Sequence, residues 1–348
     1  MADIAILGSG TWGAALAIAL VSGGNRVTVW CAHADKVPLF ETQRCHPKLP
    51  GAVIPDTVEF TGDIACAASA DIVLFAVPSV YIRGTAEQAA PYLNSRQVVA
   101  CAAKGIEGDT LFTMTDVIAD AVKKAGNPSP LRLAALSGPT HAEEVAADMP
   151  SAAIAASTDM QTARTLADAF VKTCLRVYIH PDILGTELCG AAKNVMALAS
   201  GIAVGLGFGD NTRAALITRG MAEIARLGTA MGCMPQTFSG LAGIGDLIVT
   251  ATSMHSRNNR AGIYIGQGDT PQQAIERVGM VVEGINALPA VCALAEKYHT
   301  EMPIVSAVSD ILYHGADPRE AVYRLMRRRT GEEFAGTDAV YEMNATGR

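Results

Sequence analysis

The chain has 348 residues and a mass of 36.2 kDa, which is more than one hydrophobic core usually spans, so we expect two domains. Half of the residues are hydrophobic and 18% are charged, a composition that excludes an intrinsically disordered chain, a collagen and a solvated coiled coil. The 27 Lys and Arg against 34 Asp and Glu give a net charge of −7, which disfavours a nucleic-acid partner. Any anion must therefore be bound by a local site.

The first 180 residues alternate short apolar runs with helical patterns, as parallel strands covered by crossover helices do. Strands are predicted at residues 2–7, 26–31, 71–77, 97–104, 131–136, 151–156 and 175–179. Helices are predicted at residues 11–22, 80–93, 110–124 and 160–171. This pattern predicts an α/β domain with a Rossmann-like doubly wound sheet at residues 1–180.

After Pro181 the pattern changes to long Ala- and Leu-rich stretches with helical spacing, and no further strand is expected. Helices are predicted at residues 182–204, 213–231, 271–278, 285–297, 304–313 and 318–328. We therefore predict an all-α domain at residues 181–330, followed by a flexible tail at residues 331–348.

The cysteines and the apolar runs bear on location. The eight cysteines contain no Cys-x-x-Cys pair, which favours reduced thiols in the cytoplasm. The first apolar run has no basic leader and breaks at Gly8, so no secretory signal is expected. The longest uncharged stretches, residues 194–209 and 227–245, are rich in glycine, and neither is typical of a membrane span.

A G-x-G-x-x-G pattern of Gly8, Gly10 and Gly13 lies between the first predicted strand and helix, with Thr11 and Trp12 inside it. Gly8 permits the tight turn, Gly10 admits a pyrophosphate close to the backbone, and Gly13 allows close packing of helix and strand. The pattern predicts a dinucleotide-binding turn. A glycine-rich turn without a ligand is the alternative.

The end of the second predicted strand bears on the choice between NAD and NADP. An acidic residue that would bind the ribose 2′-hydroxyl is missing at residues 29–33, and Asp35 lies slightly beyond. His33 and Lys36 offer partners for a 2′-phosphate. We predict that NADP is accepted, with a preference for NADP over NAD as an open alternative.

Two further strand ends would face the ligand crevice of such a sheet. Lys104 follows an apolar strand and precedes a glycine, which favours a site role over the alternative of a solvated lysine. Gly138 and Thr140 lie in a strand-to-helix turn whose small residues admit a flat ring. The alternative for Thr140 is a helix N-cap.

Lys193 is a single lysine inside an apolar helix of small residues. Because burying an ammonium group without a partner is costly, Lys193 must either reach water or line a polar site. Burial also moves a lysine pKa toward neutrality, which suits the residue to accept a hydroxyl proton. Asp246 lies in another apolar setting, where it either caps the following helix or orients the lysine and a substrate hydroxyl.

Residues 252–260 combine hydroxyl, guanidinium and amide groups at Ser256, Arg257 and Asn258, which suits a phosphate. A solvated loop is the alternative. Residues 281–284, taken alone, are compatible with a simple turn between helices. The seven histidines form no ligand-spaced cluster, so no metal is expected.

The motifs in order resemble the bacterial-type NAD(P)-dependent sn-glycerol-3-phosphate dehydrogenase family over residues 2–328. The segments that carry the resemblance are residues 8–13, 103–105, 137–139, 190–194, 211–216, 240–247 and 256–258. One departure is His141, where the commonest family form has Phe.

The resemblance implies a cytoplasmic enzyme that interconverts sn-glycerol 3-phosphate and dihydroxyacetone phosphate and so supplies phospholipid synthesis. It implies a catalytic set in which Lys193 moves a proton beside Lys104 and Asp246. The implied substrate contacts are Lys104, Gly138, Lys193, Asp246, Ser256, Arg257 and Asn258. The implied NAD or NADP contacts are Gly8, Gly10, Thr11, Trp12, Gly13, His33, Lys104, Thr140, Arg257, Val281 and Glu283.

Two other functions stay open at this stage. One is another two-domain dehydrogenase that acts on a hydroxy acid or on ketopantoate and has a carboxylate clamp. The other is a non-catalytic dinucleotide sensor, which would have no need of Lys193, Asp246 and Arg257 in an apolar domain. For a cytoplasmic enzyme of this size we expect a homodimer.

Overall fold

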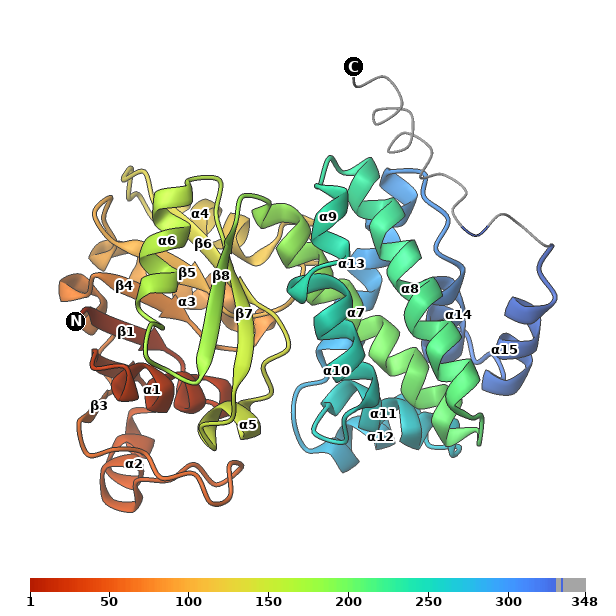
Figure 1. Cartoon of the computed structure of the whole chain (residues 1–348), viewed down its shortest axis with the longest axis horizontal. Helices are drawn as coiled ribbons and strands as arrows, with labels where there is room; N and C mark the ends of the chain where they lie inside the picture. The colour runs from red at the N-terminus through yellow and green to blue at the C-terminus, as the bar shows by residue number, and fades with distance from the viewer. Residues whose placement is uncertain (330–332, 334–348) are drawn as a thin grey trace.

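A computed structural model describes residues 1–329 and 333 of the chain. It contains an α/β unit and a helical unit that lie side by side (Figure 1). The sheet of the α/β unit has eight strands in the order β3-β2-β1-β4-β5-β6-β7-β8. All neighbouring strands are parallel except β6 and β7, which confirms the predicted Rossmann-like fold class.

The strands agree with most of the predicted ranges. They are β1 (Asp3–Leu7), β2 (Arg26–Trp30), β3 (Val58–Thr61), β4 (Ile72–Phe75), β5 (Val98–Cys101), β6 (Arg132–Ser137), β7 (Ser151–Ala156) and β8 (Leu175–His180). Strand β3 was not predicted, because it is a short edge strand in which Val58 and Phe60 alternate with polar residues.

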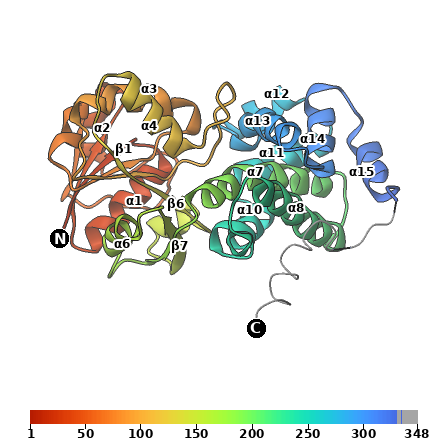
Figure 2. The same cartoon turned by 90° about the horizontal axis from the view of Figure 1, so that it is seen from above.

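Helices cover both faces of the sheet (Figures 1 and 2). They are α1 (Thr11–Ser22), α2 (Val37–Gln43), α3 (Ile82–Ala89), α4 (Met114–Lys124), α5 (Ala142–Ala146) and α6 (Met160–Asp168). Strand β1 shows why this sandwich forms. Ile4 and Ile6 belong to one core cluster and Ala5 and Leu7 to the cluster on the other face, so a continuous apolar run is buried on both sides.

The helical unit follows β8, and no strand occurs after His180 in the described part of the chain. Its helices are α7 (Ile183–Gly205), α8 (Asp210–Ala230), α9 (Pro235–Phe238), the π-helical turn η5 (Leu241–Gly245), α10 (Asp246–Thr252), α11 (Arg257–Gly266), α12 (Pro271–Val278), α13 (Glu283–Lys297), α14 (Pro303–Tyr313) and α15 (Pro318–Met326). None of the predicted helical ranges covers the segments α9 to α11, although a helix after Asp246 was one of the alternatives. The predicted tail at residues 331–348 lies outside the described residues apart from position 333.

Helix α7 is the centre of the helical unit (Figures 1 and 2). Among the described residues it is the one helix long and apolar enough to cross a membrane, but 89% of its most apolar window is buried inside the fold. A helix that is apolar all round and enclosed by other helices forms a core. The composition of α7 is therefore explained by packing.

Helices α7 and α11 cross in close contact through two pairs of glycines. A Cβ atom at Gly201 of α7 would lie 2.1 Å from the carbonyl oxygen of Asn259, and one at Gly262 of α11 would lie 2.2 Å from that of Leu198. Gly205 and Gly266 repeat this contact one turn further along. The glycines therefore fix the N-terminus of α11 relative to α7.

We predict that Gly201→Ala lowers the free energy of unfolding by about 2 kcal/mol or more, because the added methyl group forces the two backbones apart. Chemical denaturation measures the change. Gly84→Ala on α3 is the matched control, because no atom lies within 4 Å of a Cβ at this helical position. The control is expected to be neutral or to stabilise by up to ~1 kcal/mol, and equal losses in both variants would contradict the prediction.

Candidate active site

The turn between β1 and α1 is a tight backbone cradle. Gly8 has a φ of 131°, and a Cβ atom there would lie 2.8 Å from the backbone nitrogen of Val77. A Cβ atom at Gly13 would lie 1.9 Å from the carbonyl oxygen of Gly8, whereas nothing lies within 4 Å of one at Gly10. The turn is thus tightly packed at Gly8 and Gly13 and open at Gly10.

The first turn of α1, which begins with Thr11 and Trp12, has no side-chain cap. Its first backbone N–H groups therefore have no helical acceptor and can bind a negative group. The cradle and these N–H groups fit the phosphates of a dinucleotide.

His33 lies at the other end of this crevice. It follows β2 and precedes the short helical turn Ala34–Lys36, and its side chain is exposed, as are those of Asp35 and Lys36. Because β2 lies on the side of β1 away from β4 and β5, the structure does not bring His33 to the lysines described next. His33 is available to the part of a dinucleotide that extends over β2.

Four of the predicted residues meet in one buried cluster. Lys104, which follows β5, donates hydrogen bonds to the carbonyl oxygen of Gly138 at 3.0 Å and to Oδ2 of Asp246 at 2.7 Å. Lys193 of α7 donates to Oδ1 of the same carboxylate. The cluster thus joins the ends of β5 and β6 to α7 and α10, and it brings the two lysines together on one aspartate.

Thr250 is a member of this cluster that the sequence analysis missed. Its hydroxyl oxygen accepts a hydrogen bond from Lys193 at 2.6 Å, and its hydroxyl group donates to the carbonyl oxygen of Asp246 at 2.6 Å. The two residues are four positions apart on α10, so the spacing would have indicated a shared face if α10 had been predicted.

The electrostatics of the cluster favour a lysine that can change its charge. Burial lowers the pKa of Lys193 to about 7, the charge of Asp246 acts against this, and Lys104 lowers it further. Burial alone would raise the pKa of Asp246, but the two ammonium groups together hold it below its ordinary value. Lys193 is therefore poised between its two protonation states, while Asp246 stays ionised.

The structure decides against two of the alternative roles. Asp246 is the first residue of α10 and follows Gly245, and its carboxylate binds lysines instead of capping the helix. Thr140 does not cap α5, which begins at Ala142. Its hydroxyl group donates to the carbonyl oxygen of Gly138 at 3.2 Å.

The segment of Ser256, Arg257 and Asn258 is the start of helix α11 and not a solvated loop. Ser256 is the N-cap, and its hydroxyl oxygen accepts the backbone N–H of Asn259 at 3.2 Å. As the first two residues of the helix, Arg257 and Asn258 have backbone N–H groups without a helical acceptor. The guanidinium of Arg257 is half-buried in this region, and burial lowers its pKa against the opposing charge of Glu283. These groups have the chemistry to bind a second anion.

The side chain of Asn258 is used by the fold. Its amide nitrogen donates to Oδ1 of Asn194 at 2.9 Å, and its amide oxygen accepts the backbone N–H of Gly284 at 2.8 Å. These bonds tie α11 to α7 and α13. A ligand contact is expected of Asn258, and its backbone N–H and the second hydrogen of its amide nitrogen remain for one.

Residues 281–283 approach the crevice from the helical unit. The Glu283 carboxylate accepts the backbone N–H of Ser79 at 3.1 Å and its hydroxyl group at 2.5 Å. Ser79 directly follows the turn after β4, and Val281 is half-buried just before α13. This segment is therefore an inter-unit contact and more than a simple turn.

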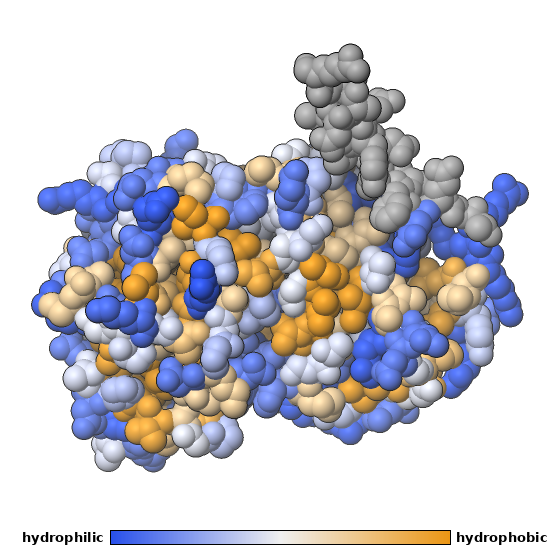
Figure 3. All heavy atoms as spheres, in the orientation of Figure 1, coloured by the Kyte–Doolittle hydropathy of each residue, from blue (hydrophilic) through white to orange (hydrophobic). Residues whose placement is uncertain are grey.

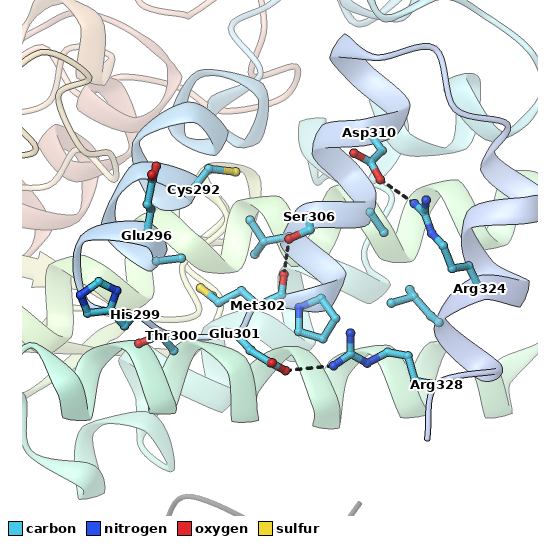
Figure 4. Close-up of a pocket in the computed structure, with 15 residues that line it drawn as sticks. Cys292, Glu296, His299, Thr300, Glu301, Met302, Ser306, Asp310, Arg324 and Arg328 are labelled. Carbon is cyan, nitrogen blue, oxygen red and sulfur yellow. Dashed lines mark hydrogen bonds and ion pairs between the residues drawn. The ribbon is translucent and has the colours of Figure 1, made fainter. Parts of the chain in front are cut away.

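A separate hollow of about 550 Å³ lies between α13, α14 and α15 (Figure 4). Its walls include His299 and two ion pairs, Arg324 with Asp310 at 2.5 Å and Arg328 with Glu301 at 3.0 Å. None of the predicted site residues lines this hollow. The candidate chemistry therefore belongs to the lysine cluster.

The comparisons with known proteins agree over almost the whole chain. Residues 3–163 match the family model described as NAD-dependent glycerol-3-phosphate dehydrogenase N-terminus, and residues 182–323 match the corresponding C-terminus. Glycerol-3-phosphate dehydrogenase (NAD(P)+) 2 of Lactobacillus delbrueckii subsp. bulgaricus is 54% identical over 96% of this chain and 99% of its own length. The Bacillus subtilis glycerol-3-phosphate dehydrogenase (NAD(P)+) is 44% identical over 96% of each chain. The crystal structure of glycerol-3-phosphate dehydrogenase from Coxiella burnetii has a TM-score of 0.87 at 36% identity and covers 93% of this chain and 98% of that one.

Proposed function

This chain belongs to the NAD-dependent glycerol-3-phosphate dehydrogenase family, and we propose that it interconverts sn-glycerol 3-phosphate and dihydroxyacetone phosphate with NAD or NADP. The observation that carries this proposal is the buried Lys193 bound to Asp246 in the cluster that joins the two units. A dehydrogenase that acts on an alcohol needs such a group to move the hydroxyl proton. A non-catalytic sensor does not.

Lys193 acts as the general acid and base. When bound, the nicotinamide supplies or accepts the hydride. As an ammonium group, Lys193 donates a proton to the carbonyl oxygen of dihydroxyacetone phosphate, and in the reverse direction neutral Lys193 takes the proton of the 2-hydroxyl group. Asp246 and Thr250 hold the amino group in a fixed direction. Lys104 adds positive charge beside the developing alkoxide.

The N-terminus of α11 binds the substrate phosphate. Arg257 contributes a planar fork of donors, and the backbone N–H groups of Arg257 and Asn258 contribute further donors, with Ser256 as the cap that orients them. Because the phosphate group is remote from the reacting carbon, binding it holds the substrate in place for proton and hydride transfer without taking part in the reaction. Gly138, whose carbonyl oxygen binds Lys104, borders the same space.

The carboxyl ends of the strands would hold the cofactor. The turn of Gly8, Gly10 and Gly13 and the N-terminus of α1 would hold its phosphates, with Thr11 and Trp12 beside them. His33 would be a further contact after β2, and the absence of an acidic residue at the end of this strand would admit the 2′-phosphate of NADP. Thr140, Arg257, Val281 and Glu283 would be the remaining cofactor contacts.

We also propose a cytoplasmic homodimer that supplies glycerol phosphate to phospholipid synthesis. None of the eight cysteines is in a disulfide in the described structure, which supports a reducing compartment. Apolar residues gather on the surface of the helical unit near α8 and α10 (Figure 3), a face that a second copy would cover. The α/β unit up to residue 180 is the cofactor domain, and residues 181–330 form the substrate domain.

The activity is tested by following NADPH and NADH oxidation with dihydroxyacetone phosphate and with ketopantoate. We expect turnover with dihydroxyacetone phosphate and none with ketopantoate, because the proposed site has hydrogen-bond donors for a phosphate group. The value of kcat/KM for NADPH is expected to equal or exceed that for NADH. A much higher value for NADH would contradict the role given to the end of β2, and turnover of ketopantoate alone would contradict the proposed substrate.

A pH profile tests the role of Lys193. Because its pKa lies at about 7, kcat/KM for glycerol phosphate oxidation is expected to rise as the pH rises through that value, whereas kcat/KM for dihydroxyacetone phosphate reduction falls. Lys193→Ala is expected to lower kcat by about 10²–10⁴-fold. Lys124→Ala, which changes an exposed lysine of α4, is the control. A kcat of Lys193→Ala close to that of the wild type would refute the assignment.

Arg257→Lys is expected to raise the KM for glycerol phosphate about tenfold or more, because lysine keeps the charge but loses the two-pronged hydrogen bond. Steady-state kinetics measures the effect. Arg277→Lys, at a surface ion pair with Asp269, is the matched control and leaves the KM unchanged. An unchanged KM in Arg257→Lys would count against the phosphate site at α11.

A further inference from the structure

Glu187 is a buried carboxyl group that the acid–base cluster does not use. It lies on α7, six residues before Lys193, and its side chain is buried. One carboxylate oxygen accepts the backbone N–H of Thr115 at 2.9 Å, and the other accepts the hydroxyl group of Thr115 at 2.5 Å. Thr115 is the second residue of α4, so this contact joins the helical unit to the α/β unit.

A carboxyl group is a costly choice for this position. Burial raises the pKa of Glu187 to about 7, although its hydrogen bonds with Thr115 act in the opposite direction. An apolar residue would pack two helices without this penalty. A carboxylate with both oxygens bound to one residue instead fixes the direction and the axial position of α7 against α4.

Helix α7 continues from Glu187 into the active site. One turn later, a Cβ atom at Gly190 would lie 3.3 Å from Cγ of Lys104. One further turn brings Lys193 to Asp246, which also binds Lys104. Since a helix is stiff over two turns, a shift of α7 at Glu187 changes how Lys193 meets Lys104 and Asp246.

Four other polar contacts join the units across long stretches of the sequence, and none is made by a residue of α7. Glu283 of α13 binds Ser79, and Lys48 donates to the carbonyl oxygen of Gly279 at 2.8 Å. Lys104 binds Asp246 of α10 at 2.7 Å, and His141 contacts the carbonyl oxygen of Val249 in α10 at 3.4 Å. Among these five contacts, the one made by Glu187 is therefore the one whose side chain belongs to the helix of the catalytic lysine.

We propose that Glu187 is a positioning residue that holds α7, through Thr115, in the place where Lys193 meets Lys104 and Asp246. The proposal rests on the proposed function, in which Lys193 moves the proton. Loss of the Glu187 carboxylate loosens α7 and admits water to Lys193. The pKa of the lysine then rises toward its ordinary value, and its amino group is misplaced.

Glu223 offers a matched control with the same chemistry at a distance from the site. It is buried on α8, and its carboxylate accepts the backbone N–H groups of Ile304 at 2.9 Å and Val305 at 3.4 Å, in the first turn of α14. Burial raises its pKa to about 7 as well. Glu223→Ala removes a buried carboxyl group and leaves the backbone N–H groups that it bound without their acceptor, as Glu187→Ala does. It leaves α7 in place.

The experiment compares Glu187→Ala, Glu187→Gln and Glu223→Ala in the full chain, with thermal midpoints and pH profiles for both reaction directions. We expect Glu187→Ala to lower kcat by about 10–100-fold, since small displacements of catalytic groups have effects of this size. In the pH profile of kcat/KM for glycerol phosphate oxidation, the rising limb of this variant is expected to shift to higher pH by about 0.5 unit or more. The KM for NADPH stays within about threefold, because the β1–α1 turn is untouched.

Glu187→Gln is expected to restore most of the activity, because its amide can accept the backbone N–H of Thr115 and donate to the hydroxyl oxygen. Glu223→Ala is expected to lower the thermal midpoint while keeping kcat and the pH limb. Thr115→Val, combined with Glu187→Ala, should add nothing further, because both changes remove one contact.

Equal losses of kcat in Glu187→Ala and Glu223→Ala, or an unmoved pH limb in Glu187→Ala, would overturn the proposal. Because the substrate phosphate also titrates near pH 6, the limb is compared between variants. Failure of the proposed function would be distinguished by a wild-type protein that does not reduce dihydroxyacetone phosphate. Failure of the positioning role alone leaves the wild-type activity and the effect of Lys193→Ala intact.

Discussion

The structure depends on one carboxylate, that of Asp246, which binds the ammonium groups of two lysines from different units. Lys104 comes from the end of a strand, Lys193 comes from the central helix, and the carboxylate is almost fully buried between them. In such a place an unpaired charge would destabilise the fold by about 3–5 kcal/mol. The two units must therefore stay together for the charges to balance, and the same requirement creates a lysine that can gain or lose a proton near neutral pH.

The rest of the architecture brings groups to this point from distant parts of the sequence. Parallel strands end at one edge of the sheet, which places the β1–α1 turn, Lys104 and Gly138 along a single crevice. Helix α7 carries Lys193 to that edge, and the glycine crossing holds the start of α11, the proposed second anion site, against α7. Hydride transfer needs a cofactor and a substrate held against each other, and under the proposed function the two anion sites on opposite units provide that arrangement.

Several of these features could be predicted from the sequence because they break a local pattern. A lysine in an apolar helix and a glycine motif between a strand and a helix both need a reason, and so Lys193 and the turn at Gly8 were found. Thr250 and Glu187 were not, because a threonine or a glutamate in a helix is ordinary until its partner is known, and their partners Lys193 and Thr115 are 57 and 72 residues away. Helix α11 was missed because Ser256 and two asparagines favour turns locally, and only the tertiary contacts of Asn258 and Asn259 make them helical.

The use of Asn258 as a tie between three helices has a consequence for how such a protein can diversify. The proposed phosphate donors at the start of α11 are the side chain of Arg257 and main-chain N–H groups, and substitution leaves the main-chain groups in place. Removing all of these donors therefore requires the helix itself to move, and the amide of Asn258 together with the glycine crossing opposes that movement. Under the proposed function, substrate binding and core packing thus depend on the same helix, and a change to one requires a change to the other.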